Sequence, residues 1–149
     1  MDAVIFIGIQ GSGKSTFYRQ HFFDTHLRIS LDMLRTRHRE RLFVEACIAT
    51  GQRFVVDNTN VLRSERAEYI LRARDAGFHV HGYFFEPQVH RAIAWNEQRT
   101  GQARIPLKGL LGTLKRMERP NLEEGFDFLY RVDVDEANEF IVKALMAPA

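Results

Sequence analysis

The nine residues GIQGSGKST at positions 8–16 constrain this chain more than any other stretch, because they follow an unbroken apolar run at positions 3–7. That order predicts a buried strand, a glycine-rich loop and the start of a helix. In such a loop, backbone N–H groups turn inward around phosphate oxygens, Lys14 adds a positive charge, and the Ser15 hydroxyl can bind Mg²⁺. A purely structural turn does not require lysine and serine after its last glycine. The motif therefore predicts a site for a nucleoside triphosphate.

We expect this loop to bind ATP, or another nucleoside triphosphate, together with Mg²⁺. The positive end of the following helix dipole should add to the attraction for phosphate. The Lys14 side chain is expected to be solvated until phosphates reach the loop. The residues predicted to contact the nucleotide are Gly8, Gln10, Gly11, Ser12, Gly13, Lys14, Ser15 and Thr16, with Arg104 from a later segment.

The pattern of apolar residues predicts strands that alternate with helices along the whole chain. The predicted strands span residues 3–7, 27–29, 53–56, 79–85 and 128–132, and the predicted helices span residues 14–21, 31–50, 63–76, 88–99, 107–117 and 136–146. Alternation of this kind indicates a parallel sheet that is covered on both faces. We therefore expect an α/β fold with a mostly parallel five-stranded sheet, helices on both faces and a short helical lid.

Length and composition limit the possible classes of protein. A chain of 149 residues with 45% hydrophobic residues can form one compact core, so we expect a single domain at residues 1–149. The formal charge is only +2, but arginine makes up 17 of the 21 basic residues, which favours bidentate phosphate contacts. The single cysteine, Cys47, excludes an internal disulfide and lies in an apolar, helix-like setting. The start of the chain resembles neither a signal peptide nor a membrane span, so we expect a cytoplasmic protein without a membrane partner.

A second group of polar residues follows the second predicted strand, where strand ends form a cleft in sheets of this kind. On the long helix predicted there, Asp32, Arg35 and Arg39 recur on one face. Arg37 and Arg41 fall on the opposite side, where we expect them to be solvated. A carboxylate beside guanidiniums suits an acceptor hydroxyl that is flanked by a phosphate. In the alternative interpretation, Asp32 complements the helix dipole and pairs with Arg35 at the surface.

The third predicted strand ends at Asp57, where proteins with this loop place the acid that holds Mg²⁺ directly or through water. We therefore predict Ser15 and Asp57 as metal ligands. Asn58, Thr59 and Asn60 follow, and all three can hydrogen-bond phosphate or carboxylate. In the alternative interpretation, these four residues form an Asx-type turn that caps the next helix. The two interpretations are compatible for Asn60.

A polar segment between two predicted helices suggests a lid that carries an arginine. Arg99 and Arg104 flank this segment. An arginine delivered by a closing lid would neutralise charge on a phosphoryl group during transfer. Arg99 is our first candidate for this role and Arg104 the second. In the alternative interpretation, both are solvent-facing arginines near a helix C-terminus. Trp95, just before, is expected to pack rather than to stack on a base.

Together these residues resemble the kinase domain of the phage-type polynucleotide 5′-kinases, within the broader group of small P-loop kinases. The resemblance covers nearly the whole chain and rests on the segments GIQGSGKST, ISLDMLR, VVDNTN and NEQRTGQARIP. It implies a three-layer P-loop NTPase fold and ATP-dependent phosphorylation of a hydroxyl. It also implies that Asp32 is the general base, that Arg35 binds a phosphate of the acceptor strand, and that Arg99 contacts the donor phosphates. Asp57 would belong to the active-site network.

We therefore expect a P-loop kinase whose favoured acceptor is a nucleic acid 5′-hydroxyl end. Its predicted catalytic residues are Lys14, Asp32, Arg35 and Arg99. The same skeleton serves kinases of small metabolites, nucleosides and antibiotics, which form the enzymatic alternative. An alternative from another class is an ATP-dependent switch that transfers no group. The pairing of Asp32 with Arg35 argues against the switch, because a switch needs no base for an acceptor.

Overall fold

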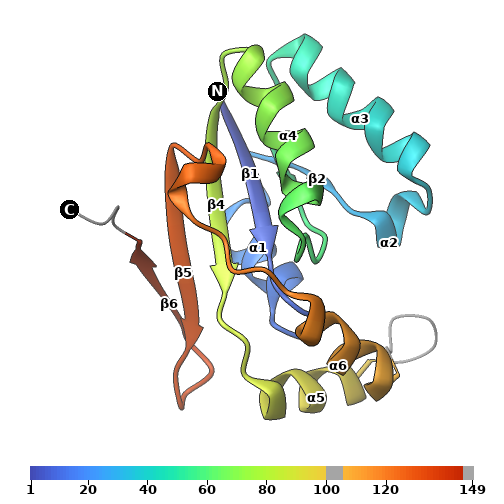
Figure 1. Cartoon of the computed structure of the whole chain (residues 1–149), viewed down its shortest axis with the longest axis vertical. Coiled ribbons are helices and arrows are strands. Elements are labelled where there is room, and N and C mark those ends of the chain that lie inside the picture. The colour runs from blue at the N-terminus through green and yellow to red at the C-terminus, as the bar shows by residue number, and fades with distance from the viewer. Residues whose placement is uncertain (100–105, 146–149) are drawn as a thin grey trace.

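The computed structural model describes residues 1–99 and 106–145, which form a six-stranded sheet with helices on both faces (Figure 1). The strands are β1 (Asp2–Ile7), β2 (Leu27–Ile29), β3 (Phe54–Val56), β4 (His79–Phe85), β5 (Phe128–Val134) and β6 (Phe140–Ala144). Their order across the sheet is β2-β3-β1-β4-β5-β6. Neighbours from β2 to β5 are parallel, and β6 is antiparallel to β5. The predicted α/β class with a mostly parallel sheet is confirmed.

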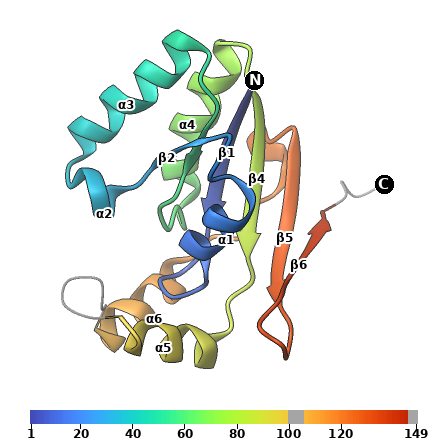
Figure 2. The same ribbon diagram turned by 180° about the vertical axis from the view of Figure 1, so that it is seen from behind.

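The helices divide between the two faces and one end of this sheet. They are α1 (Lys14–His21), α2 (Leu31–Leu34), α3 (Arg37–Thr50), α4 (Arg63–Asp75), α5 (Val89–Glu97) and α6 (Leu107–Arg116), with a short 3₁₀ helix η2 (Leu122–Glu124). Figure 1 shows α3 and α4 over one face, and the reverse view in Figure 2 shows α1 over the other. Helices α5 and α6 lie beyond the carboxyl end of β4. No helix among the described residues has the length and apolar character needed to cross a membrane.

Strand β1 is buried because its alternating side chains enter two apolar clusters. Ile5 belongs to the cluster under α3 and α4, which includes Val44 and Ile70. Phe6 belongs to the cluster under α1, where its ring meets that of Phe17 edge to face at 5.8 Å between centroids. Burying a side chain of this size contributes about 1.5–3 kcal/mol. This burial anchors the strand end from which the glycine-rich loop begins.

The predicted helix at residues 31–50 is interrupted, which is the first correction to the sequence-based prediction. The backbone of Arg35 is left-handed (φ 74°), and α2 ends there. The Thr36 side chain then accepts a hydrogen bond from the Arg39 N–H at 3.1 Å and caps α3. Threonine is common at the N-cap of a helix. The apolar residues on either side keep helical spacing, however, so the sequence pattern does not indicate the break. Because the helix is interrupted, Asp32, Arg35 and Arg39 do not share one continuous helical face.

The predicted helix at residues 136–146 is also wrong, because this segment forms β6 and adds a sixth strand. A tight turn directs the chain back along β5: the Asp135 carboxylate accepts hydrogen bonds from the Ala137 and Glu139 N–H groups at 2.9 Å. Asn138 takes the left-handed conformation that such turns require. The bulky residues Phe140, Ile141 and Val142 then favour a strand over a helix.

The remaining elements lie close to their predicted positions. Helix α1 and strands β2 and β4 have the predicted bounds, and β1, β3, α4, α5 and α6 differ by at most two residues at either end. Cys47 is confirmed as a buried residue of α3. The polar segment at residues 100–105, which was predicted as the lid, lies outside the described residues.

A buried ion pair ties α4 to η2 next to the end of β3. The Arg66 guanidinium donates to both carboxylate oxygens of Glu124, at 2.8 and 3.0 Å, and its third hydrogen bond reaches the Asn60 carbonyl at 2.9 Å. Arg66 is fully buried, and the Glu124 side chain is 2% exposed. Buried charges require such pairing, because removal of one partner leaves the other without compensation.

We predict that Arg66→Met lowers the free energy of unfolding by about 3–5 kcal/mol, because Glu124 is left buried and unpaired. Urea denaturation followed by circular dichroism would measure this. The matched control is Arg63→Met, which removes an exposed arginine from the first turn of the same helix and should change stability little. Equal losses for the two variants would contradict the structural role of the ion pair.

Candidate nucleotide and phosphoryl-transfer site

The glycine-rich loop is held tightly between β1 and α5. The Gly8 N–H donates to the Thr59 carbonyl at 2.9 Å, which joins the start of the loop to the segment after β3. Gly11 and Gly13 have left-handed backbones (φ 73° and 92°). A Cβ at Gly11 would lie 2.4 Å from the Ala92 carbonyl oxygen of α5, and one at Gly13 would lie 2.4 Å from the Trp95 ring. Only glycine combines this conformation with so close an approach.

Lys14 is buried, so the expectation that it is solvated before phosphates arrive is wrong. Its Nζ donates to the Gly8 and Ile9 carbonyls, at 2.9 and 2.7 Å. Burial lowers the pKa of Lys14 to about 8, and the charge of Asp57 acts in the opposite direction. The lysine therefore lies folded against its own loop, and we expect it to exchange carbonyl partners for phosphate oxygens when nucleotide binds.

The predicted metal ligands meet at the carboxyl ends of β1 and β3. The Ser15 hydroxyl, in the first turn of α1, donates to the Asp57 carboxylate at 3.1 Å. Neighbouring ligands in an octahedron with bonds of about 2.1 Å lie about 3 Å apart, so these two oxygens fit a Mg²⁺ ion. Arg28 of β2 contacts both: its Nε donates to Asp57 at 2.8 Å and its Nη2 to Ser15 at 3.0 Å. No sequence motif indicated Arg28, whose only signal is a charge within a short apolar strand.

One cavity brings the main predicted residues together. It has a volume of about 210 Å³, and Lys14, Ser15, Asp32, Asp57 and Arg99 all line it. Asp32 reaches it from the first turn of α2, Asp57 from the end of β3 and Arg99 from beyond α5. Cationic side chains, the glycine-rich loop and an exposed carboxylate thus surround one space. This arrangement can hold a phosphate chain next to a proton acceptor.

The arginine beside Asp32 differs from the predicted one. Arg37 lines this cavity, whereas the described lining includes neither Arg35 nor Arg39. The helix break at Arg35 separates α2 from α3, so the spacing of one continuous helix does not decide which arginine of α3 reaches the site. Arg37 is exposed, as expected, with 52% of its side chain accessible, but it also pairs with Glu40 and Glu65. The role of Arg35 as a contact for the acceptor stays a prediction.

Arg99 lies next to the end of the glycine-rich loop. Arg99 lines a second cavity with Gly13 and Thr16, together with Trp95. Trp95 packs against Gly13 and meets the Phe140 ring edge-on at 6.5 Å between centroids. Arg104, the second candidate for the lid arginine, lies outside the described residues.

The other loop residues have identified partners. Gln10 Nε2 donates to the Thr113 hydroxyl of α6 at 3.0 Å, and the Ser12 hydroxyl donates to the Ile9 carbonyl at 2.8 Å. The loop therefore contacts α6 as well as α5. Binding of phosphate requires only backbone N–H groups from these positions, so the side-chain bonds of Gln10 and Ser12 can maintain the shape of the loop.

The two asparagines after Asp57 form structural contacts. Asn60 is buried, and its Nδ2 donates to the Phe6 carbonyl at 2.9 Å. Asn58 accepts from the Leu31 N–H at 2.9 Å and donates to the Glu40 carboxylate at 2.7 Å. Asn58 thereby fixes the start of α2, and hence the position of Asp32. This connection through Glu40 has no counterpart among the sequence-based predictions.

We predict that ADP binding above pH 8 takes up a proton at Lys14. The pKa of Lys14 is about 8 in the free protein, and bound phosphates favour the charged amine and raise that pKa. At pH 8.5 the parent should take up a substantial fraction of a proton. Isothermal titration calorimetry in two buffers with different heats of ionisation measures this number. Lys14→Met should weaken ADP binding about tenfold or more and abolish the uptake.

The matched control is Lys115→Met, which removes an exposed lysine of α6 and should leave the proton uptake unchanged. Nucleotide affinity in the parent should fall as the pH rises above 8, because the neutral amine must first gain a proton. Binding without proton uptake at pH 8.5 would show that Lys14 is already charged in the free loop.

Comparison with solved structures shows that this chain shares its fold with Kti12, a gluconokinase and an APS kinase. Kti12 from Chaetomium thermophilum, in complex with ADP-AlF3, is 20% identical with a TM-score of 0.67, covering 91% of this chain and 92% of that chain. A gluconokinase from Sinorhizobium meliloti 1021 is 20% identical with a TM-score of 0.61, covering 89% and 82%. The Mycobacterium tuberculosis APS kinase CysC, in complex with AMPPNP and APS, is 18% identical with a TM-score of 0.55, covering 91% and 89%.

A match to a family model gives the family of the chain itself. The model is described as an AAA domain, and it matches residues 4–120. That segment begins in β1, contains the glycine-rich loop and the residues around the cavity, and continues past α6. Because the match extends over most of its length, this chain belongs to the AAA domain family AAA_33.

Proposed function

We propose that this protein is a P-loop kinase that transfers the terminal phosphoryl group of ATP, or of a related nucleoside triphosphate, to a hydroxyl group. The observation that supports this proposal is the single cavity lined by Lys14, Ser15, Asp57, Asp32 and Arg99. The first three residues suit the donor phosphates. A nucleotide-dependent switch needs no carboxylate that faces the donor site, so Asp32 favours transfer over the switch.

The loop and its lysine would position the donor. Backbone N–H groups of residues 9–15, including the start of α1, would surround the phosphates, and Lys14 would move from the loop carbonyls to their oxygens. Ser15 and Asp57 would hold Mg²⁺, which neutralises phosphate charge when bound. Arg99 lies on the same cavity and would balance negative charge on the oxygens of the transferring group.

Asp32 would act on the acceptor. Its side chain is exposed to the cavity from the first turn of α2, which Asn58 holds through the Leu31 N–H. A carboxylate there can accept the proton of a hydroxyl as the oxygen attacks the terminal phosphorus. The bond between that phosphorus and the bridging oxygen breaks, and the leaving group is the nucleoside diphosphate. Asn58 and Glu40 act by positioning α2 rather than by touching the reacting atoms.

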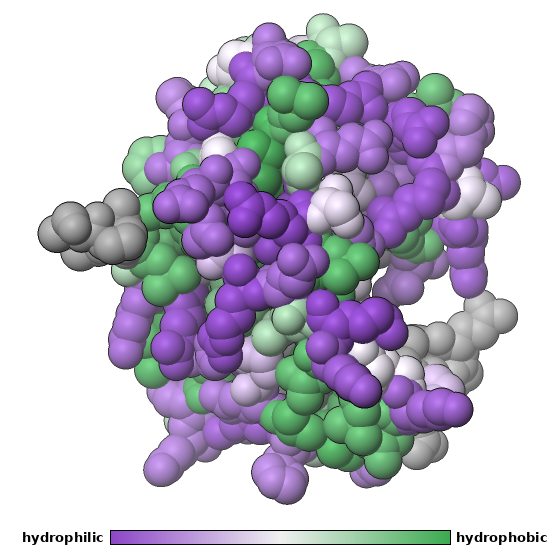
Figure 3. All heavy atoms as spheres, viewed as in Figure 1, coloured by the Kyte–Doolittle hydropathy of each residue, from purple (hydrophilic) through white to green (hydrophobic). Residues whose placement is uncertain are grey.

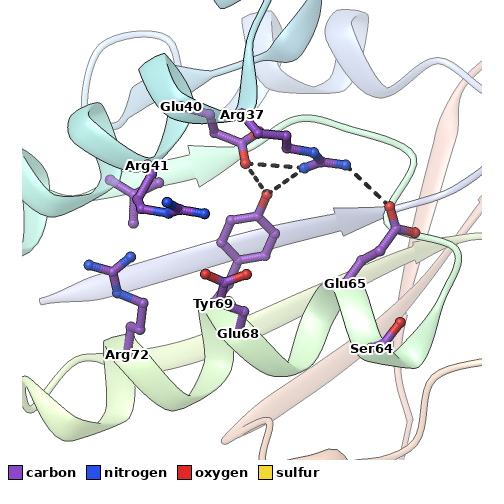
Figure 4. A pocket seen from close by; sticks show the side chains of 9 residues that line it. Arg37, Glu40, Arg41, Ser64, Glu65, Glu68, Tyr69 and Arg72 are labelled. Atoms are coloured by element: carbon purple, nitrogen blue, oxygen red, sulfur yellow. Dashed lines mark hydrogen bonds and ion pairs between the residues drawn. The ribbon is translucent and has the colours of Figure 1, made fainter.

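A groove between α3 and α4 is our candidate for the body of the acceptor (Figure 4). It has a volume of about 240 Å³ and shares Arg37 with the phosphoryl-transfer cavity. Figure 4 shows Arg41 and Arg72 projecting from facing helices beside Tyr69. The groove is lined by Arg37, Arg41, Arg72, Glu40, Glu65 and Glu68, together with Val44, Ser64 and Tyr69.

The charges of this groove are balanced, which bears on the chemistry of the acceptor. Three arginines face three glutamates, and Arg37 pairs with Glu40 and Glu65 at 3.2 and 3.3 Å. Hydrophilic side chains dominate the surface over α3 and α4 in Figure 3. A nucleic acid acceptor, the favoured expectation from the sequence, would be better served by an excess of positive charge. The groove therefore supports a small polar acceptor, and a nucleic acid 5′-end is the second candidate.

We predict that Asp32→Asn lowers the rate of phosphoryl transfer by about a hundredfold or more and leaves ADP affinity nearly unchanged, because asparagine keeps the shape but accepts no proton. Transfer from γ-labelled ATP would be measured with a 5′-hydroxyl oligonucleotide, a nucleoside, neutral sugars and sugar acids. The control is Asp75→Asn, which changes an exposed acid at the end of α4. If no acceptor were labelled by the parent although it binds ADP, the switch would replace the kinase.

We predict that Arg41→Met raises the KM for the acceptor about tenfold with little change in kcat, because it removes a charged contact from the groove only. Arg39→Met is the matched comparison on the same helix. Its Nη1 contacts the Leu34 carbonyl at 3.4 Å, and it lies outside the described lining of both cavities. The uninterrupted helix expected from the sequence predicts the reverse, with Arg39→Met as the damaging change.

A further inference from the structure

Arg28 occupies a position at the metal subsite that none of the roles described above explains. It lies in the middle of β2, and its side chain is 24% exposed. Its guanidinium contacts both predicted metal ligands: Nε donates to Asp57 at 2.8 Å, and Nη2 donates to the Ser15 hydroxyl at 3.0 Å. The three side chains form a triangle. The third side of the triangle is the hydrogen bond from Ser15 to Asp57. The remaining Nη1 contacts the Met33 sulfur at 3.4 Å.

Arg28 therefore uses the same oxygen atoms that a Mg²⁺ ion would need. The Ser15 hydroxyl gives its proton to Asp57, and its oxygen accepts the hydrogen bond from Arg28. A metal ion bound to that oxygen would take the place of the arginine N–H. The metal ion and the Arg28 guanidinium would also both contact the Asp57 carboxylate, only a few ångströms from each other. Away from bulk water, the repulsion between two positive charges at that distance is substantial.

The Asp57 side chain is only 2% exposed, so it needs a positive partner at all times. Arg28 supplies that partner in the free protein. A divalent ion that arrives with a nucleotide supplies a stronger one, because it brings phosphate oxygens that complete its coordination. Free Mg²⁺ without nucleotide lacks these oxygens and competes less well.

We propose that Arg28 competes with Mg²⁺ for Ser15 and Asp57, so that the metal enters only with the nucleotide phosphates. This inference rests on the proposed function, in which those two residues hold the ion. Arg28 leaves the pair as Mg-nucleotide binds and returns when the product departs. It thus sets the Mg²⁺ concentration at which the nucleotide site becomes fully occupied.

The test measures ADP binding by isothermal titration calorimetry, first in EDTA and then over a series of Mg²⁺ concentrations. Arg28→Met keeps most of the side-chain length and removes the charge. In EDTA its ADP affinity should stay within about threefold of the parent value. The Mg²⁺ concentration for half-maximal tightening of ADP binding should fall about tenfold, because a charge-assisted contact no longer opposes the ion.

Arg53→Met is the matched control. It removes an exposed arginine at the opposite, amino-terminal end of β3 and should leave the Mg²⁺ dependence of ADP binding at the parent value. Thermal melts give a second measure. Arg28→Met should melt at a lower temperature than the parent without ligand, and the difference should shrink in saturating Mg-ADP, where the ion replaces the lost charge. If Arg28→Met does not fold, Arg28→Gln retains a donor for Asp57 and should shift the Mg²⁺ dependence in the same direction.

An unchanged Mg²⁺ dependence in the folded variants would overturn the proposal and leave Arg28 as a structural ion pair. A parent whose ADP affinity does not respond to Mg²⁺ would overturn it as well. Failure of the parent to bind ADP both in EDTA and at saturating Mg²⁺ would instead contradict the proposed function itself, and the competition would fall with it.

Discussion

The burial of β1 at the centre of the sheet is the constraint on which the site depends. Apolar clusters on both faces hold this strand, so the chain leaves the sheet at Gly8 in a defined place and direction. The segment after β3 is attached to the same point, because Asn60 bonds the Phe6 carbonyl and Gly8 bonds the Thr59 carbonyl. The loop and the acid at the end of β3 are thereby placed together before any ligand binds.

The charged groups of the free protein satisfy one another, and this has consequences for nucleotide binding. Lys14 is bonded to two loop carbonyls, and Asp57 is bonded to Ser15 and Arg28. In the proposed function, each partner would be exchanged when phosphates and a metal ion bind. Exchange of this type costs less than burying an unpaired charge, because a partner is present at the start and at the end. This cost would lower nucleotide affinity.

Positioning residues link this centre to the groove between α3 and α4. The buried Glu40 carboxylate accepts hydrogen bonds from Tyr69 and Arg37 on the groove side and from Asn58 on the cavity side. Asn58 in turn holds the first turn of α2, which carries Asp32. Glu40 contacts both Arg37 and Asn58. A ligand in the groove that moves Arg37 would therefore also shift the first turn of α2 and the position of Asp32. The groove and the proposed base therefore form one connected unit.

The sequence alone determined the glycine-rich loop, most of the order of strands and helices up to β5, and the meeting of Ser15 with Asp57. These follow from local patterns: apolar spacing sets each element, and parallel strands bring their carboxyl ends to one edge. It did not reveal the break at Arg35 or the final strand β6, because capping by Thr36 and the turn at Asp135 compete with apolar spacing that reads as helix. Only the tertiary structure brought Arg28 onto Asp57 and Arg37 to the cavity. Those contacts join side chains from different elements, and their geometry depends on how neighbouring strands and helices pack rather than on spacing along the chain.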